Sequence, residues 1–224
     1  MCFSANASFG AGAVLLVVGA LTLKKVHSPS QIAFASIPLL FSVQQFAEGL
    51  LWLSLTNKNY EGWEPFSTHF FLFFAQVLWP LWVPVSILLL ERNTERKKIL
   101  FILTGIGILL SSYFAWCLLN YPVKAEVIFY HIYYTLDFPH ALVWVSGILY
   151  LILTVFPPFM SSHKKVWLLG IMIAASYLFT KIAYSNYLIS VWCFFAAIIS
   201  VLVLYIVTKM NKFKNQNNQP GAEK

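Results

Sequence analysis

Charged side chains are scarce in this sequence. Only 10% of its 224 residues are Asp, Glu, Lys or Arg, whereas 59% are hydrophobic. Soluble domains carry about 25% charged residues, so this composition excludes an ordinary soluble domain and indicates a membrane protein. The aromatic fraction of 17% agrees with a chain that has many interfacial anchors. No basic segment precedes the first apolar run, so no cleavable signal peptide is expected.

Long apolar runs separated by short polar segments predict seven transmembrane helices. The predicted spans are residues 7–23, 31–55, 67–90, 99–120, 137–155, 166–184 and 187–208, within one domain of residues 1–209. Residues 121–136 are too polar to span, and they predict either a short hairpin or an interfacial helix. The polar tail 210–224 is expected to be disordered and cytoplasmic. The expected fold class is therefore all-α, an integral membrane bundle of seven helices.

The basic residues are distributed unevenly between the two sides of the predicted membrane. All but three of the 15 Lys and Arg residues fall on one side, and the exceptions are Lys58, Lys124 and Lys181. Cytoplasmic loops carry an excess of Lys and Arg, which places the N-terminus outside and the C-terminus in the cytoplasm. The net charge of +7 therefore reflects topology, and no nucleic-acid partner is expected.

Glu48 is the only acidic residue within a long apolar run. A carboxylate in hydrocarbon costs ~2.5–3.5 kcal/mol on insertion scales, so intramembrane acids usually line a functional site. Gln45, Glu48 and Trp52 follow the i, i+3, i+7 spacing and share one helix face. Lys181 is the only basic residue within a span, at a depth similar to that of Glu48. An ion pair between them is expected, with snorkelling of Lys181 to the headgroups as the alternative.

Polar residues concentrate in the outer halves of the predicted spans, whereas the inner halves are almost entirely aliphatic or aromatic. In a helical bundle, polar side chains gather where a cavity lies. This distribution predicts an outward-facing polar pocket between the helices for a small or lipid-like ligand. The predicted pocket residues are Gln44, Gln45, Glu48, Trp52, Asp137, His140, Tyr177, Lys181 and Trp192.

Metal-binding spacings are missing from the chain. It contains no Cys-x-x-Cys, His-x-x-x-His or His-Glu-x-x-His, and ceramidase-like membrane metallohydrolases need a His-x-x-x-His pair. No cofactor is expected. Zinc or haem remains an alternative, because thiolate and imidazole ligands suit both and several such residues map to the outer side. They are Cys2, His69, His131, His140 and Cys193.

Three blocks of the sequence are distinctive: Met-Cys-Phe-Ser-Ala at 1–5 with Ser-Phe at 8–9, Gln-Gln-x-x-Glu-Gly-x-x-Trp at 44–52, and Ser-Val-Trp-Cys-Phe-Phe-Ala-Ala at 190–197. Together they resemble a family of uncharacterised bacterial multi-pass membrane proteins. The resemblance extends over most of the chain. It implies a multi-pass protein of the bacterial inner membrane, and it implies no activity.

Three functions stay open at the level of sequence. The first is a non-catalytic protein that binds a small or lipid-like ligand from the outer side. The second is a membrane-embedded enzyme in which Glu48 acts as acid or base, with or without a metal. The third is a small transporter in which Glu48 carries a coupling proton. The expected partners are the lipid bilayer and the ligand, and a receptor role would need a further membrane protein, because the cytoplasmic loops are short.

Overall fold

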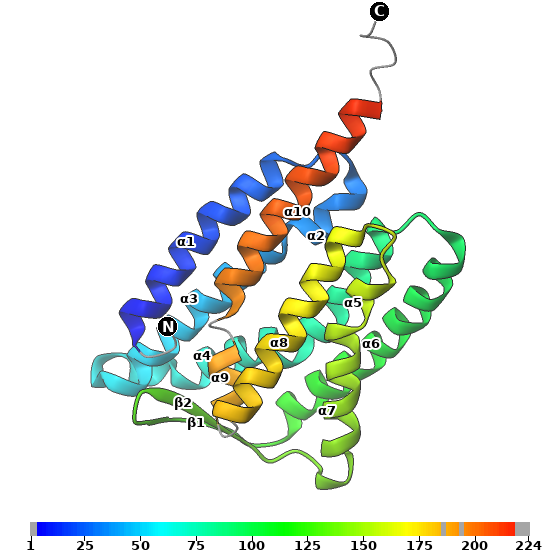
Figure 1. Cartoon of the computed structure of the whole chain (residues 1–224). Helices are drawn as coiled ribbons and strands as arrows, with labels where there is room; N and C mark the ends of the chain where they lie inside the picture. Colours follow the sequence, from blue (N-terminus) through cyan, green and yellow to red (C-terminus); the bar gives the residue numbers. More distant parts are fainter. Residues whose placement is uncertain (1–3, 185–186, 193–194, 218–224) are drawn as a thin grey trace, which may run out of the picture.

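The computed structural model describes residues 4–184, 187–192 and 195–217, which form a helical bundle with one β-hairpin (Figure 1). The helices are α1 (Ala5–Lys24), α2 (Ile32–Ala35), α3 (Ile37–Thr56), α4 (Glu64–Leu72), α5 (Trp79–Leu90), α6 (Thr94–Asn120), α7 (His140–Val155), α8 (Trp167–Ala183), α9 (Leu188–Trp192) and α10 (Ala196–Asn217). A π-helical segment, η3 (Phe73–Leu78), joins α4 to α5. Short 3-10 helices form η1 (Pro29–Gln31), η2 (Lys58–Trp63), η4 (Pro157–Met160) and η5 (Lys164–Val166).

Five helical segments of the described chain are long and apolar enough to cross a membrane. They are Ala5–Lys24, Pro29–Thr56, Lys58–Leu90, Thr94–Asn120 and Lys164–Ala183. Two further apolar helices, His140–Val155 and Ile198–Met210, are shorter. The structure thus supports a bundle with several apolar helices, of which five have the length of a span. The last predicted span is divided between α9 and α10, and α10 continues to Asn217 into the predicted tail.

The described chain is mostly helical, which is compatible with the all-α prediction. Of the two alternatives for residues 121–136 it forms the hairpin, in which β1 (Val123–Ile128) and β2 (His131–Leu136) pair antiparallel. Residues 121–136 are rich in β-branched and aromatic side chains, which favour strands. Ile132 is fully buried, and Tyr134 stacks on Phe71 of α4 with ring centroids 5.3 Å apart. Phe129 begins the turn with φ = 56°. The hairpin therefore packs on the bundle as an ordered element.

Helix α1 packs against α3 through its small residues. Gly12 and Gly19 are buried, and Ser42 of α3 donates a hydrogen bond to the carbonyl oxygen of Gly12 at 2.7 Å. A Cβ atom added at Gly19 would lie 2.9 Å from the backbone nitrogen of Leu39. Small residues allow such close approach of helices when van der Waals packing holds them together. The glycines of the first apolar run therefore set the distance between α1 and α3.

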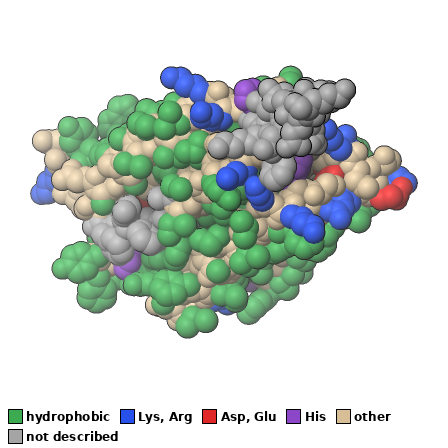
Figure 2. Space-filling model, turned by 45° about the horizontal axis from the view of Figure 1, so that its top comes forward, with side chains coloured by type: hydrophobic (Ala, Val, Ile, Leu, Met, Phe, Trp, Pro, Cys, Tyr) green, Lys and Arg blue, Asp and Glu red, His purple; other side chains and the backbone are tan. Residues whose placement is uncertain are grey.

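The loops that carry most basic residues lie together at one end of the bundle, which we call the basic end (Figure 1). The C-terminal ends of α1 and α10, the α5–α6 loop and the α7–α8 connection meet there, and Figure 2 shows Lys and Arg side chains across this face. The hairpin lies at the opposite end, which we call the hairpin end. The clustering of basic residues on one side agrees with the sequence prediction.

Glu91 holds two loops together at the basic end. Its side chain is only 1% exposed, and its carboxylate accepts hydrogen bonds from the backbone N–H groups of Arg92 and Asn93, each at 2.8 Å. Ser162, 71 residues further on, donates through its backbone N–H at 2.5 Å and its hydroxyl at 2.6 Å. Burial raises the pKa of Glu91, but the hydrogen bonds outweigh this effect and hold the pKa below its ordinary value.

Replacing Glu91 by Gln is expected to lower the free energy of unfolding by about 1–3 kcal/mol at neutral pH, because an amide nitrogen would face N–H donors. A carboxyl with a lowered pKa in the folded state stabilises the protein above the pKa of unfolded Glu. That stabilisation is lost as the pH falls through the folded pKa. The difference between wild type and Glu91→Gln should therefore shrink on acidification when denaturant unfolding is followed from pH 7 downward.

The matched control is Glu95→Gln, because Glu95 is exposed and only forms a surface ion pair with Lys98 at 2.9 Å. Its effect should stay below about 0.5 kcal/mol and depend little on pH. Equal behaviour of the two variants would show that the hydrogen bonds to Glu91 do not stabilise the loop junction.

Candidate functional site

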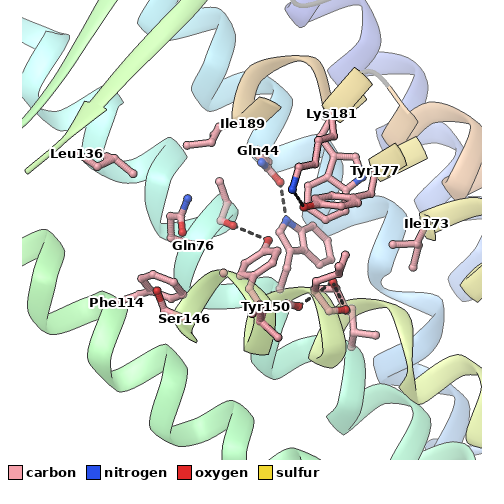
Figure 3. Close-up of a pocket in the computed structure, with 18 of the residues that line it drawn as sticks. Gln44, Gln76, Phe114, Leu136, Ser146, Tyr150, Ile173, Tyr177, Lys181 and Ile189 are labelled. Carbon is pink, nitrogen blue, oxygen red and sulfur yellow. Dashed lines mark hydrogen bonds between the residues drawn. The ribbon is translucent and has the colours of Figure 1, made fainter. Parts of the chain in front are cut away.

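A cavity of about 550 Å³ lies among η3 and the helices α3 and α5–α10, with one residue of β2 also in its lining (Figure 3). Its walls are mostly apolar and come from segments far apart in the sequence. The aliphatic and aromatic lining includes Ile37, Phe41, Val83, Phe114, Leu136, Phe138, Ile148, Leu151, Leu169, Ile173, Ile189 and Ile199. Ligand sites in proteins commonly measure 300–1,000 Å³, with apolar walls and a few placed polar groups. The size and lining of this cavity match that description.

One wall is fixed by Trp79 of α5. Its indole N–H donates to the Oε1 atom of Gln44 at 2.8 Å, and its ring stacks on Phe41 with centroids 4.0 Å apart. Gln44 is 1% exposed and Trp79 is 6% exposed. Burial of these two polar groups costs little free energy, because the indole N–H and the amide oxygen form a hydrogen bond with each other. This contact joins α3 to α5 and orients two residues of the lining.

A second wall is formed around the π-helical segment. The hydroxyl of Tyr150 on α7 donates to the carbonyl oxygen of Ala75 at 2.6 Å, and Ser111 of α6 donates to the carbonyl oxygen of Val77 at 2.7 Å. Side chains of two other helices thus bind carbonyl groups of the irregular segment, where π-helical turns are often functional. Gln76 lies between these two anchors and lines the cavity. Its side-chain amide has no hydrogen bond to another described residue.

A third wall, formed by α8 and α9, contains the positively charged side chain of Lys181. Lys181 of α8 donates to the hydroxyl of Tyr177 at 3.3 Å, and its Nζ atom lies 5.6 Å from the centroid of that ring. Tyr177 also packs against Trp192 of α9, with ring centroids 5.6 Å apart. The indole N–H of Trp192 donates to the Oγ atom of Ser176 at 2.9 Å. Figure 3 shows the Lys181 ammonium directed toward the Tyr177 hydroxyl inside the cavity.

The cavity reaches the molecular surface along α7. Trp144 and Ile148 both line it, and they are 79% and 57% exposed. Lys181 is exposed as well. The lining also extends to Val83 and Thr154, which lie toward the basic end. The cavity therefore runs along the bundle axis, and the outward-facing ligand pocket stays a prediction.

Four of the nine residues predicted for the pocket line the cavity: Gln44, Tyr177, Lys181 and Trp192. Asp137, which follows the hairpin, and His140, the first residue of α7, are both exposed and lie outside the lining. Gln45, Glu48 and Trp52 are also outside it, and each is buried on another face of α3. The structure thus divides the predicted set into cavity residues, surface residues and a separate interior cluster.

Glu48 is the centre of that interior cluster. Its side chain is 0% exposed, and its carboxyl group accepts hydrogen bonds from Gln45 Nε2 and Ser190 Oγ, both at 3.2 Å. Lys181 binds Tyr177 and forms no ion pair with Glu48, so the predicted pairing is wrong. Counting residues along a helix measures depth alone, whereas these two side chains point to different parts of the bundle. Glu48 instead connects α3 to α9.

The residues considered for zinc or haem are dispersed in the described part of the chain. His69 is exposed and its Nδ1 atom lies 2.7 Å from the carbonyl oxygen of Pro65. His131 stacks on Tyr187 with ring centroids 4.7 Å apart, and burial lowers its pKa. No group of three His, Cys, Asp or Glu among the described residues has the geometry to hold a metal ion. The two candidates Cys2 and Cys193 lie outside the described residues.

Sequence reasoning missed several residues of the cavity. Polar residues in the outer halves of the predicted spans predicted Lys181 as a pocket residue, whereas Gln76 and Tyr150 were passed over because they lie near or beyond the middle of their spans. Two patterns in the sequence point to them. Pro80 has no N–H for the carbonyl group of Gln76, four residues earlier, and so marks an irregular turn. Ser146, Tyr150 and Thr154 recur at i, i+4 and i+8, which places three polar side chains on one face of α7.

The bundle of long apolar helices indicates a membrane protein, and a mostly apolar cavity lies between its helices. The chain belongs to DUF6629, a family of unknown function, which matches residues 1–218. This match agrees with the resemblance of its three sequence blocks to an uncharacterised family. No curated protein and no solved structure matches the chain.

Proposed function

We propose that this protein binds a lipid-like amphiphile in the cavity between α3, η3 and α5–α10. The observation that carries the proposal is the composition of one continuous cavity of about 550 Å³. Aliphatic and aromatic side chains form most of its surface, and the side chains of Gln76, Tyr177 and Lys181 supply local polar groups. A molecule with an apolar body and a polar head matches both parts of this lining.

Access from the bilayer supports a lipid-like ligand. The exposed residues Trp144 and Ile148 belong to α7, which is shorter than the five long segments and borders the cavity. An apolar molecule dissolved in the membrane reaches such a site laterally without crossing water. A polar ligand that arrived from the aqueous phase would first meet the apolar residues of this opening, which offer it no hydrogen bonds.

The enzyme and transporter hypotheses both depended on Glu48 facing a ligand. Its side chain is fully buried and does not belong to the cavity lining. Because Glu48 is not part of the lining, Lys181 is the charged side chain of the described lining. The described lining contains no carboxylate or imidazole that could form a general acid and base pair with it. Ligand binding without catalysis is therefore the function that the cavity supports best.

Substitution of Gly147 by Trp tests this proposal. Gly147 lines the cavity between Val143 and Leu151, which lie one helical turn away on either side and also line it, and a Cβ atom added there would have no neighbour within 4 Å. We expect extraction of co-purified lipids, followed by mass spectrometry, to show a species bound to the wild type that is at least about tenfold depleted in Gly147→Trp.

Gly105→Trp is the matched control, because Gly105 is an exposed residue of α6 outside the lining and its Cβ position is equally open. This variant should retain the bound species. Equal lipid content in all three proteins would refute the cavity as a binding site.

We further place the protein in the bacterial inner membrane as a multi-pass protein, with the basic end in the cytoplasm. The clustering of Lys and Arg at that end supports this orientation. Reporter fusions after Thr94 and Lys214 should therefore report the cytoplasm, and a fusion within residues 57–64 should report the exterior. The reverse pattern would invert the orientation. Spans corresponding to α7 and to α9 with α10 complete the proposed count of seven.

A further inference from the structure

The cavity has an uncompensated positive charge. Lys181 is the only charged residue in the lining that the structure describes, and neither Asp nor Glu lies within ion-pairing distance of it. Its ammonium group has three donors, and the hydroxyl of Tyr177 takes one of them in the structure. The Lys181 side chain is exposed, so its ammonium group is accessible to an anionic head at the opening of the cavity and attracts that head through its charge.

We propose that Lys181 is the headgroup site and that the ligand is an anionic amphiphile, with one carboxylate or phosphate group at the end of an apolar chain. This inference rests on the proposed function and specifies the chemical class of its ligand. The Nζ atom of Lys181 supplies the charge, and the Tyr177 hydroxyl beside it offers a further hydrogen bond to the same head. Charge-assisted hydrogen bonds of this kind are about twice as strong as neutral ones.

The rest of the lining is arranged for the apolar chain. Trp192 and Ile173 follow Lys181 and Tyr177 along the wall, and no other charged side chain of the described lining interrupts the path. The volume of about 550 Å³ lies within the range of about 300–1,000 Å³ that is common for ligand sites, so the cavity has room for an apolar chain together with its head. Chains too long for the cavity would extend through the opening at α7.

The polarity of the head can be tested with two photoactivatable probes of equal length. Dodecanoic acid and dodecanol, each with a diazirine at the same carbon, are titrated against the full chain in nanodiscs of neutral phosphatidylcholine. Labelled peptides are then assigned by mass spectrometry. We expect saturable labelling of α5, α7 and α8 in the wild type, with half-saturation by the acid at about tenfold lower concentration than by the alcohol.

Variants of Lys181 separate charge from packing. Lys181→Met should remove the preference for the acid while alcohol labelling persists, and Lys181→Arg should keep the preference. Lys124→Met is the matched control, because Lys124 is an exposed residue of β1 outside the lining. Acid and alcohol partition into each nanodisc in the same ratio for all variants, so changes in the acid-to-alcohol ratio report the site itself.

The outcomes distinguish this inference from the proposed function. Saturable labelling that Gly147→Trp abolishes, combined with an acid-to-alcohol ratio that Lys181→Met leaves unchanged, would overturn the anionic ligand and keep the cavity as a lipid site. Absence of saturable labelling by either probe in the wild type would overturn both. Dodecyl phosphate as competitor identifies the preferred head: displacement at lower concentration than unlabelled dodecanoate indicates phosphate, and the reverse indicates carboxylate.

Discussion

Replacing Glu48 by Ala is expected to lower the free energy of unfolding by about 3–4 kcal/mol. The substitution removes a fully buried carboxyl group and leaves the donors of Gln45 and Ser190 without their acceptor. Each unsatisfied buried donor costs about 1–3 kcal/mol, and the vacated volume adds to that cost. Because Ser190 belongs to α9, the loss also loosens the segment that carries Trp192 into the cavity wall.

The measurement is thermal or denaturant unfolding of the purified protein in one detergent. Glu48→Gln is the conservative comparison, because its amide oxygen still accepts a hydrogen bond, and its loss should be smaller. Glu95→Ala at an exposed position should change stability by less than about 0.5 kcal/mol. The double variant of Glu48→Ala with Lys181→Met should show additive effects, because the two side chains do not meet. Strong coupling between them would contradict the separation seen in the structure.

Replacing Gly107 by Ala is expected to destabilise the protein by about 1–3 kcal/mol, because the added methyl group overpacks a close helix contact. The new Cβ atom would lie 2.7 Å from the carbonyl oxygen of Pro80 and 3.5 Å from the Cα atom of Leu81. Pro84 has no N–H to bind that carbonyl group in the helix, so the oxygen projects toward α6. The close contact with the Pro80 carbonyl oxygen can be relieved only if the backbone of α5 shifts, and α5 also carries Trp79.

Gly105→Ala is the matched control on the same helix. Its Cβ position is open to a distance of 4 Å, and Ala favours helix by about 1 kcal/mol over Gly. The two variants should therefore change the unfolding temperature in opposite directions when they are compared in the same detergent. A stabilising effect of Gly107→Ala would show that α5 and α6 do not pack as closely as the structure has them.

Glu48 and Gly107 both lie in helix–helix contacts that position the walls of the cavity. Glu48 ties α3 to α9, and the contact between Gly107 and Pro80 ties α6 to α5. Neither Glu48 nor Gly107 lines the cavity. Their substitution should reduce ligand binding only as far as stability falls, whereas Gly147→Trp should reduce binding at nearly unchanged stability. This contrast separates support of the cavity from direct contact with its ligand.

Part of the site was predictable because it depended on the cost of burying polar groups. Gln44 and Lys181 interrupt apolar runs, Tyr177 and Trp192 carry polar groups within such runs, and each of the four lines the cavity. The pairing of Glu48 with Lys181 failed for a geometric reason. Equal depth along the membrane normal does not define the rotation of two helices about their own axes. Glu48 instead has among its partners Gln45, one helical turn away, and Ser190 on α9.

The amino-acid sequence by itself determined the class of protein, the location of the apolar helices and the clustering of basic residues at one end. These properties depend on local composition, because each helix satisfies its own backbone hydrogen bonds and each loop keeps its charge in water. Only the tertiary structure decided that residues 121–136 form a hairpin and that η3, α5, α7 and α8 enclose a cavity. Those features depend on contacts between distant residues, such as Tyr134 with Phe71 and Tyr150 with Ala75, and local hydropathy carries no information about such contacts.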